Sequence, residues 1–348
     1  MASLGIIGAG ASGLSAAWAL RNTSIDATLF EKSRGYSGRA ATRRRQGTRY
    51  DHGANYIKPT SERVTRLLTE HLPTDTLEDI GRDIWTFDRR GVLSPGDEEA
   101  NAEPKWTYRE GISTIGKLLA DEADAAIHLQ TRIASVEAHA DRWDVVDTDA
   151  ERYGPFDALL LTPPAPQTAD LIRASVMPSH LRTTLLEGAS VAAYTSQFTF
   201  VLAYDRPVSR PEGAYALLNT DREHPIAWLS FEHDKPGHVP EGAAVLIVQM
   251  APAWTAERID MDPDELLPDV TRLAEDVLDA SLASPAWTDV QRWRYSLPTA
   301  PANTDALDHG AEHGLFFAGD AIAGTGRVGR ALETGLDVAD RIQAFLLD

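Results

Sequence analysis

The residues with the clearest chemical purpose lie at the N-terminus, where residues 8–13 (GAGASG) follow a short apolar run. Glycines at the first, third and sixth positions suit a tight turn, the approach of backbone to a pyrophosphate, and close packing of a helix on a strand. The helix that begins here would present free N–H groups and the positive end of its dipole to an anion. The pattern therefore predicts a phosphate-binding loop for a dinucleotide, formed by Gly8, Gly10, Ala11, Ser12 and Gly13.

An acidic and a basic residue extend this loop. Glu31 ends the second predicted strand, 18 residues after Gly13, where a carboxylate accepts hydrogen bonds from the hydroxyls of an adenosine ribose. The segment from Glu31 to Arg39 resembles the extension of glutathione-reductase-type and amine-oxidase-type flavoproteins, in which Gly-Gly-Arg runs along the pyrophosphate. Ser37 stands here in place of the first glycine of that pair. The planar donors of the Arg39 guanidinium match diphosphate oxygens.

A second fingerprint lies near the other end of the chain. Gly319 and Asp320 follow the apolar residues 314–318 (GLFFA) and precede a glycine-rich segment and the last predicted helix. This order resembles the second flavin fingerprint of the same flavoproteins, in which the aspartate holds the ribitol chain. The two fingerprints together imply FAD, bound non-covalently. The resemblance implies further cofactor contacts from Lys32, Gly38, Asn55, Tyr56, Ile133, Thr162 and Gly329.

Segments spread over nearly the whole chain resemble the renalase family of small flavoproteins: residues 30–35 (FEKSRG), 50–56 (YDHGANY), 106–112 (WTYREGI), 226–229 (IAWL) and 292–298 (RWRYSLP). The resemblance implies oxidation of reduced nicotinamide dinucleotide isomers (misformed dihydropyridines) to NAD(P)+, with hydride passing to flavin and electrons then to molecular oxygen. Such a site needs an aromatic wall that holds the nicotinamide against the flavin. The candidates for this wall are Tyr56, Tyr108, Trp228, Trp293 and Tyr295.

Two alternatives keep the flavin but change the function. A flavin amine oxidase often uses an aromatic cage and a lysine near the flavin, and of the five lysines only Lys235 lies in the predicted substrate region. A non-catalytic flavin-binding protein would bind FAD without turnover. Fold alone does not decide among these functions. No spacing of His, Asp and Glu is typical of a metal site, so we predict no metal ligand.

The elements that must position these residues predict an α/β fold. Residues 4–31 read as strand, glycine-rich turn, helix and strand, which is one βαβ unit, whereas residues 32–49 read as loop. Residues 190–250 alternate and are rich in β-branched and aromatic side chains, as expected of an antiparallel sheet. Because the Rossmann elements at both ends of the chain bracket this sheet, we expect two discontinuous domains, and the resemblance to the renalase family implies a p-hydroxybenzoate-hydroxylase-like fold. The FAD-binding domain would comprise residues 1–60, 105–170 and 285–348, and the substrate domain residues 61–104 and 171–284.

Composition limits the partners of this 348-residue chain. Its 33 basic and 52 acidic residues give a net charge of −19, which repels nucleic acid and anionic membrane surfaces. No window approaches the roughly 20 apolar residues of a membrane span, and no export signal is recognisable, so we expect a cytoplasmic protein. The absence of cysteine excludes disulfides and thiolate chemistry. Acid excess together with so few lysines indicates a halophilic protein.

Overall fold

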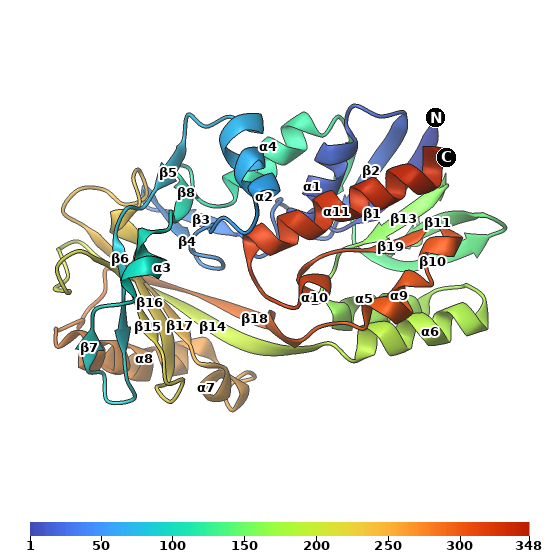
Figure 1. Cartoon of the computed structure of the whole chain (residues 1–348). Helices are drawn as coiled ribbons and strands as arrows, with labels where there is room; N and C mark the ends of the chain where they lie inside the picture. The colour runs from blue at the N-terminus through green and yellow to red at the C-terminus, as the bar shows by residue number, and fades with distance from the viewer. Residues whose placement is uncertain (348) are drawn as a thin grey trace.

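The computed structural model describes residues 1–347 as two halves that lie side by side (Figure 1). One half, here called the Rossmann half, is built on a parallel sheet with the strand order β19-β13-β1-β2-β9. The bounds of these strands are β1 Ala2–Ile7, β2 Ile25–Glu31, β9 Ala126–Leu129, β13 Ala158–Leu161 and β19 Leu315–Phe317.

Both faces of this sheet are buried, because successive apolar side chains of each strand enter different cores. Ile6 and Leu29 pack under the helices of one face, whereas Ile7 and Phe30 pack on the other. The first face is covered by α1 (Ala11–Leu20), α4 (Thr114–Glu122) and α11 (Val328–Leu347). The other is covered by α5 (Ala165–Ala174), α6 (Ser179–Ser190) and a small sheet of β10 (Ile133–His139), β11 (Arg142–Asp147) and β12 (Arg152–Phe156).

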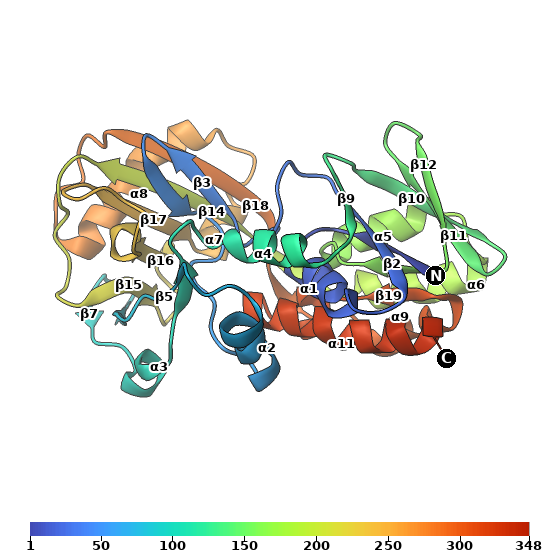
Figure 2. The same ribbon diagram turned by 90° about the horizontal axis from the view of Figure 1, so that it is seen from above.

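The other half is a seven-stranded sheet with the order β18-β14-β17-β16-β15-β6-β7. All its neighbours are antiparallel except β15 and β6. Helix α8 (Pro263–Leu278) covers one face with its apolar side. On the opposite face Val201, Val245 and Ile247 are buried against Tyr50, and the sheet lies beside the Rossmann half (Figure 2). The bounds are β6 Asp83–Phe87, β7 Leu93–Ser94, β14 Ala193–Tyr204, β15 Ala214–Asn219, β16 Ile226–Phe231, β17 Ala244–Met250 and β18 Trp287–Ala300.

Short elements connect the halves. Helix α2 (Glu62–Arg66) continues into a π-helical turn (Leu67–His71) beside α11. Two-stranded ladders join β3 to β4 and β5 to β8. Within residues 1–347, no helix combines the length and apolar character that a bilayer span requires. The remaining bounds are β3 Thr42–Arg45, β4 Thr48–Asp51, β5 Leu77–Asp79, β8 Trp106–Tyr108, α3 Glu98–Ala102, α7 Pro252–Ala256, α9 Thr304–Asp308 and α10 Asp320–Ala323.

The Rossmann unit and the antiparallel middle are confirmed, but one expectation is wrong. Residues 32–49 are not simply loop, because β3 and the first half of β4 lie within them. This basic hairpin finds its partners on a distant strand: Arg43 Nη1 donates to Asp289 Oδ2 at 2.7 Å, and Arg45 Nη1 donates to the Thr288 carbonyl at 2.8 Å. Tertiary partners therefore stabilise strands that the local polar sequence does not predict.

The proposed division into domains also differs in several places from the packing of the chain. Helix α2, for example, falls in the predicted substrate segment 61–104, but its Val64 packs in the core of the Rossmann half. Strand β18, which falls in the predicted FAD-binding segment 285–348, pairs with β14 in the seven-stranded sheet. Helix α6, which falls in the predicted substrate segment 171–284, packs with the Rossmann half. The strands that belong together are those whose edges pair, and this pairing crosses the predicted boundaries. The likeness to p-hydroxybenzoate hydroxylase stays a prediction.

Candidate functional site

The glycines of the phosphate loop have the geometry that their spacing predicts. Gly8 has a φ of +106°, a conformation that side chains disfavour. A Cβ on Gly13 would lie 2.1 Å from the Gly8 carbonyl oxygen, so helix and strand approach too closely for any other residue. A Cβ on Gly10 would meet nothing within 4 Å. The space in front of Gly10, at the start of α1, therefore fits a pyrophosphate.

Glu31 lies beside this loop, as predicted. Its carboxylate is buried, and it accepts hydrogen bonds from the backbone N–H of Ala9 at 3.0 Å and of Ser33 at 2.8 Å. Each carboxylate oxygen has further lone pairs for ribose hydroxyls. Ser37 is held against the loop by its N–H, which donates to the Ala9 carbonyl at 2.8 Å. Its φ of +79° is a conformation that favours glycine, the residue that the resembled fingerprint has at this position.

The two flavin fingerprints meet in one ion pair. Arg39 donates to Asp320 through both terminal nitrogens, at 2.6 and 2.8 Å. Arg39 also donates to the carbonyls of Tyr295 and Ser296 on β18, at 3.2 and 3.1 Å. The Tyr194 hydroxyl donates to Asp320 at 2.9 Å. Arg39 thus ties the second fingerprint to the seven-stranded sheet, and it fixes the carboxylate predicted to hold the ribitol.

Some of the other predicted cofactor residues lie beside the phosphate loop, and others lie farther from it. Thr162 Oγ1 donates to the Ile7 carbonyl at 2.9 Å, and Gly319 lies near both Thr162 and Ser12. A Cβ on Gly38 would approach the Gly10 Cα at 3.4 Å. Three residues lie farther out: Lys32 donates to Gln167, Ile133 begins β10, and Gly329 packs against the backbone of Lys58.

Residues 52–56, which follow β4, form a loop between the two halves, here called the floor loop. Side chains of the seven-stranded sheet form hydrogen bonds with the polar groups of this loop. Trp293 Nε1 donates to the His52 carbonyl at 3.0 Å, and Gln249 Nε2 donates to the Gly53 carbonyl at 2.7 Å. Ser230 Oγ donates to Asn55 Oδ1 at 3.0 Å. From the Rossmann side, the Arg39 carbonyl accepts from the Ala54 N–H at 3.0 Å. The floor loop is therefore fixed from both halves.

The predicted aromatic wall is only partly brought together. Tyr56 and Trp228 lie with ring centroids 6.2 Å apart, and both contact Tyr215, a residue that the sequence did not single out. Trp293 stacks on His52 at 5.4 Å, and Tyr295 contacts Tyr194 at 5.9 Å.

Tyr108, by contrast, is fully buried in the core of the Rossmann half. Its hydroxyl has no partner among the described residues, and burial raises its pKa. The structure therefore gives Tyr108 the surroundings of a core residue.

Four charged side chains form a fully buried cluster beneath the floor loop. Lys235 Nζ lies 2.7 Å from Asp51 Oδ2 and 3.1 Å from Glu232 Oε1. His238 Nδ1 lies 2.8 Å from the same Glu232 oxygen, and its Nε2 lies 2.8 Å from the Tyr108 carbonyl oxygen. Both ring nitrogens of His238 face acceptors, so both carry protons. Two cations and two anions then make the cluster neutral.

The pKa shifts agree with this assignment. Burial alone would lower the pKa of Lys235 and His238, but the adjacent carboxylates outweigh burial and raise both. Burial would raise the pKa of Glu232, but Lys235 and His238 hold it below its ordinary value. Asp51, Glu232 and His238 are close enough to ligate a metal ion. The Lys235 ammonium already occupies the position between the carboxylates, and a protonated His238 has no lone pair for a metal.

His52 has a different environment. It is buried against Trp293, and burial, followed by the positive charge of Arg43, lowers its pKa to about 4. Its Nδ1 has no partner among the described residues. His52 is therefore a neutral imidazole at neutral pH and cannot serve there as a proton donor of imidazolium type.

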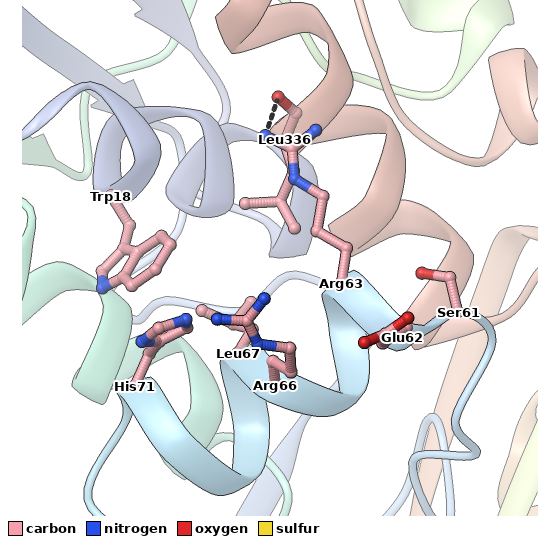
Figure 3. Close-up of a pocket in the computed structure, with 8 residues that line it drawn as sticks. All are labelled: Trp18, Ser61, Glu62, Arg63, Arg66, Leu67, His71 and Leu336. Atoms are coloured by element: carbon pink, nitrogen blue, oxygen red, sulfur yellow. Dashed lines mark hydrogen bonds between the residues drawn. The ribbon is translucent and has the colours of Figure 1, made fainter.

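A surface cavity of about 590 Å³ lies elsewhere, between α1, the α2–π-helix segment and α11 (Figure 3). Its lining contains none of the predicted site residues. In this cavity Arg63 donates hydrogen bonds to Asp337, Asp340 and the Leu336 carbonyl. Its guanidinium therefore joins α2 to α11 and is not free to bind an anionic ligand. The candidate active site is therefore the region of the phosphate loop and the floor loop, not this cavity.

A phosphate loop with room at Gly10, tied through Arg39 to an aromatic-lined sheet, defines the class of flavin-dependent oxidoreductases. A family model described as flavin-containing amine oxidoreductase matches residues 76–343, and one described as an NAD(P)-binding Rossmann-like domain matches residues 6–71. The first match covers more than half of the chain, so the protein belongs to the flavin-containing amine oxidoreductase family. It is an FAD-dependent oxidoreductase.

Solved structures share this fold over nearly their whole length. A structure titled as a protoporphyrinogen oxidase from Exiguobacterium matches with a TM-score of 0.80 and 15% identity, covering 99% of each chain. A putrescine oxidase variant gives 0.76 at 13% identity and 99% coverage of each chain. A reduced UDP-galactopyranose mutase gives 0.76 at 12% identity, over 100% of this chain and 95% of the other. At such low identities these likenesses concern the fold alone.

Sequence reasoning missed several residues of this region. Gln249 was detectable, because it is the one polar residue in the otherwise apolar strand β17 (AVLIVQM). Tyr215 lies within the region predicted as an antiparallel sheet but was not singled out, and Asp51 and Glu232 are 181 residues apart in the chain. Such a distant pair leaves no local signal.

Proposed function

We propose that this protein is a renalase-type oxidase of reduced nicotinamide dinucleotide isomers. FAD, when bound, supplies a hydride acceptor that returns two electrons to oxygen. In this proposal the FAD is non-covalent, and its phosphates bind at residues 8–13. Its ribitol binds at Asp320, and the dihydropyridine lies against Tyr56 and Trp228.

The observation that carries the proposal is that three carboxylates near the floor loop are already paired with neighbouring side chains. Asp51 and Glu232 are neutralised by Lys235 and His238, and Asp289 is bound by Arg43 and by the Tyr50 hydroxyl. A free carboxylate is one of the groups that bind a protonated amine, an aromatic cage being the other. A neutral dihydropyridine needs only aromatic surface and uncharged hydrogen-bonding groups.

The chain's own residues then bind, orient and shield the substrate. Lys235 is held by two carboxylates, so it is not free for the role of the lysine that amine oxidases place near the flavin. His52 is neutral, in keeping with a reaction in which the substrate leaves a hydride and needs little acid–base assistance. The floor loop is fixed from both halves, which favours a defined distance between donor and acceptor.

The test is product formation in air. Purified protein reconstituted with FAD should convert dihydropyridine isomers other than ordinary NAD(P)H to NAD(P)+, and it should consume one oxygen molecule per substrate molecule. Amines, including diamines, should give no oxygen consumption. Oxidation of amines without oxidation of any dihydropyridine would overturn the proposal in favour of an amine oxidase. FAD binding with no turnover of either class would favour a non-catalytic flavin-binding protein.

A further inference from the structure

A row of side chains crosses four adjacent strands of the seven-stranded sheet. Trp228 on β16 pairs in register with Gln249 on β17, Gln249 pairs with Thr199 on β14, and Thr199 pairs with Gln291 on β18. Directly opposite residues project from the same face of an antiparallel sheet. The row therefore forms one continuous strip of two amides, a hydroxyl and an indole N–H.

This strip faces the floor loop, not α8. Gln249 Nε2 donates to the Gly53 carbonyl at 2.7 Å, whereas the neighbouring Val248 enters the core beneath α8. Trp228 contacts Tyr56 of the floor loop, with ring centroids 6.2 Å apart. The strip is thus the part of the sheet nearest to the residues that we assign to substrate binding.

Three members of the strip keep unused hydrogen-bonding capacity. Thr199 is fully buried, yet its hydroxyl has no partner among the described residues, and neither has Trp228 Nε1. Gln249 uses its amide nitrogen on Gly53, while no described residue donates to its Oε1. Gln291, at the end of the row, differs because Arg43 donates to its oxygen and its nitrogen donates to the Arg292 carbonyl. Buried polar groups without partners are costly. The Tyr108 hydroxyl is such a group inside the Rossmann core, whereas Thr199 and Trp228 lie on the face of the sheet that meets the floor loop, so their retention points to a ligand.

The hydrogen-bonding groups of the strip indicate the chemical class of its ligand. It carries no charge, and it offers a donor at Trp228 next to acceptors at Gln249 and Thr199. A primary carboxamide has a matching carbonyl acceptor and NH2 donors. We propose that Gln249, with Thr199 and Trp228, forms a subsite that recognises the carboxamide of the dihydropyridine substrate. This inference rests on the proposed function and makes it specific: the substrate is recognised by its amide substituent as well as by its ring.

The experiment compares two substrates that differ only in this substituent. A dihydropyridine dinucleotide with the 3-carboxamide is compared with its 3-acetyl analogue, which keeps the carbonyl but lacks the NH2 donors. The readout is the ratio of the two kcat/KM values in the FAD-loaded enzyme. Because the ratio compares substrates within one variant, a general loss of activity cancels. We expect the wild type to prefer the carboxamide about tenfold or more, since a lost hydrogen bond that leaves a buried group unpaired costs about that factor.

Gln249→Leu removes the acceptor and should bring the ratio close to one. Thr199→Val should lower the ratio in the same direction. Valine has the shape of threonine and favours strands, and the Thr199 hydroxyl has no partner to lose, so this variant tests the subsite even if Gln249→Leu folds poorly. Gln291→Leu is the matched control, because that amide lies in the same row but is already used by Arg43, and it should leave the ratio unchanged.

The outcomes separate two failures. A wild type that oxidises both analogues equally well, or a ratio unchanged in both Gln249→Leu and Thr199→Val, overturns the carboxamide subsite and leaves the proposed oxidase function standing. A wild type that oxidises neither analogue overturns both. Product binding gives an independent readout: the absorbance change of bound flavin on titration with NAD+ should require about tenfold more NAD+ in Gln249→Leu than in the wild type.

Discussion

Replacing Lys235 by methionine tests the buried charge cluster. The side chain is fully buried and lies within 2.7 and 3.1 Å of the Asp51 and Glu232 carboxylates. Methionine keeps much of the volume but removes the charge, which leaves two buried carboxylates against the single His238 cation. Breaking a buried ion pair from one side costs about 3–5 kcal/mol, because the remaining charge has no compensation. We expect the free energy of unfolding to fall by that amount in Lys235→Met.

Urea unfolding at pH 7 gives the measurement, since urea does not screen charges as guanidinium chloride does. Lys117→Met is the control: Lys117 is exposed on α4, and its loss should change the stability by no more than about 0.5 kcal/mol. Adding Glu232→Gln to Lys235→Met restores neutrality and should recover part of the loss. If Lys235→Met costs no more than the control, or if the double variant is less stable by the sum of the single losses, the neutral-cluster interpretation is refuted.

Three further predictions concern the phosphate loop, His52 and the surface charge. Gly10→Ala should keep the fold but lose FAD affinity, because its Cβ enters the open space, whereas Gly13→Ala should destabilise the fold by clashing with the Gly8 carbonyl. Flavin titration measures the first effect and thermal unfolding the second. Equal effects of the two variants in both assays would contradict the assignment. In the folded protein the pKa of His52 is lowered to about 4, so the unfolded chain binds a proton at His52 more readily than the folded protein does. The free energy of unfolding present above about pH 6.5 therefore decreases, by about 3 kcal/mol, as the pH falls toward 4. His52→Phe should remove this part of the acid slope in urea unfolding, and an unchanged slope would show that His52 is not held neutral. The net charge of −19 predicts that the unfolding temperature rises with molar KCl as repulsion is screened, and a fall would count against a halophilic protein.

The phosphate loop was predictable because its information is local. The glycine spacing, the apolar strand before it and the helix after it fix the turn without reference to the rest of the chain, and Gly8, Gly10 and Gly13 have the predicted geometry. Glu31 was predictable for the same reason, since it ends the next strand of the same βαβ unit.

The remainder of the site was less predictable because distant segments complete it. The β3–β4 hairpin depends on β18, more than 240 residues away in the chain. From the local sequence alone its arginines predict a loop, because their hydrogen-bond partners lie on that distant strand. The aromatic candidates divide for a similar reason: Trp228 faces the floor loop, whereas Tyr108 is in the core, although both are aromatic residues on short strands. Residue type alone does not tell which face of a strand meets solvent, core or ligand.

The most direct test of the proposed function is the spectrum of the FAD-loaded protein under anaerobic conditions. We predict that adding a dihydropyridine isomer of NAD(P)H bleaches the oxidised flavin band, that admitting oxygen restores it, and that amines leave it unchanged. Bleaching by amines, with no response to any dihydropyridine isomer, would contradict the account.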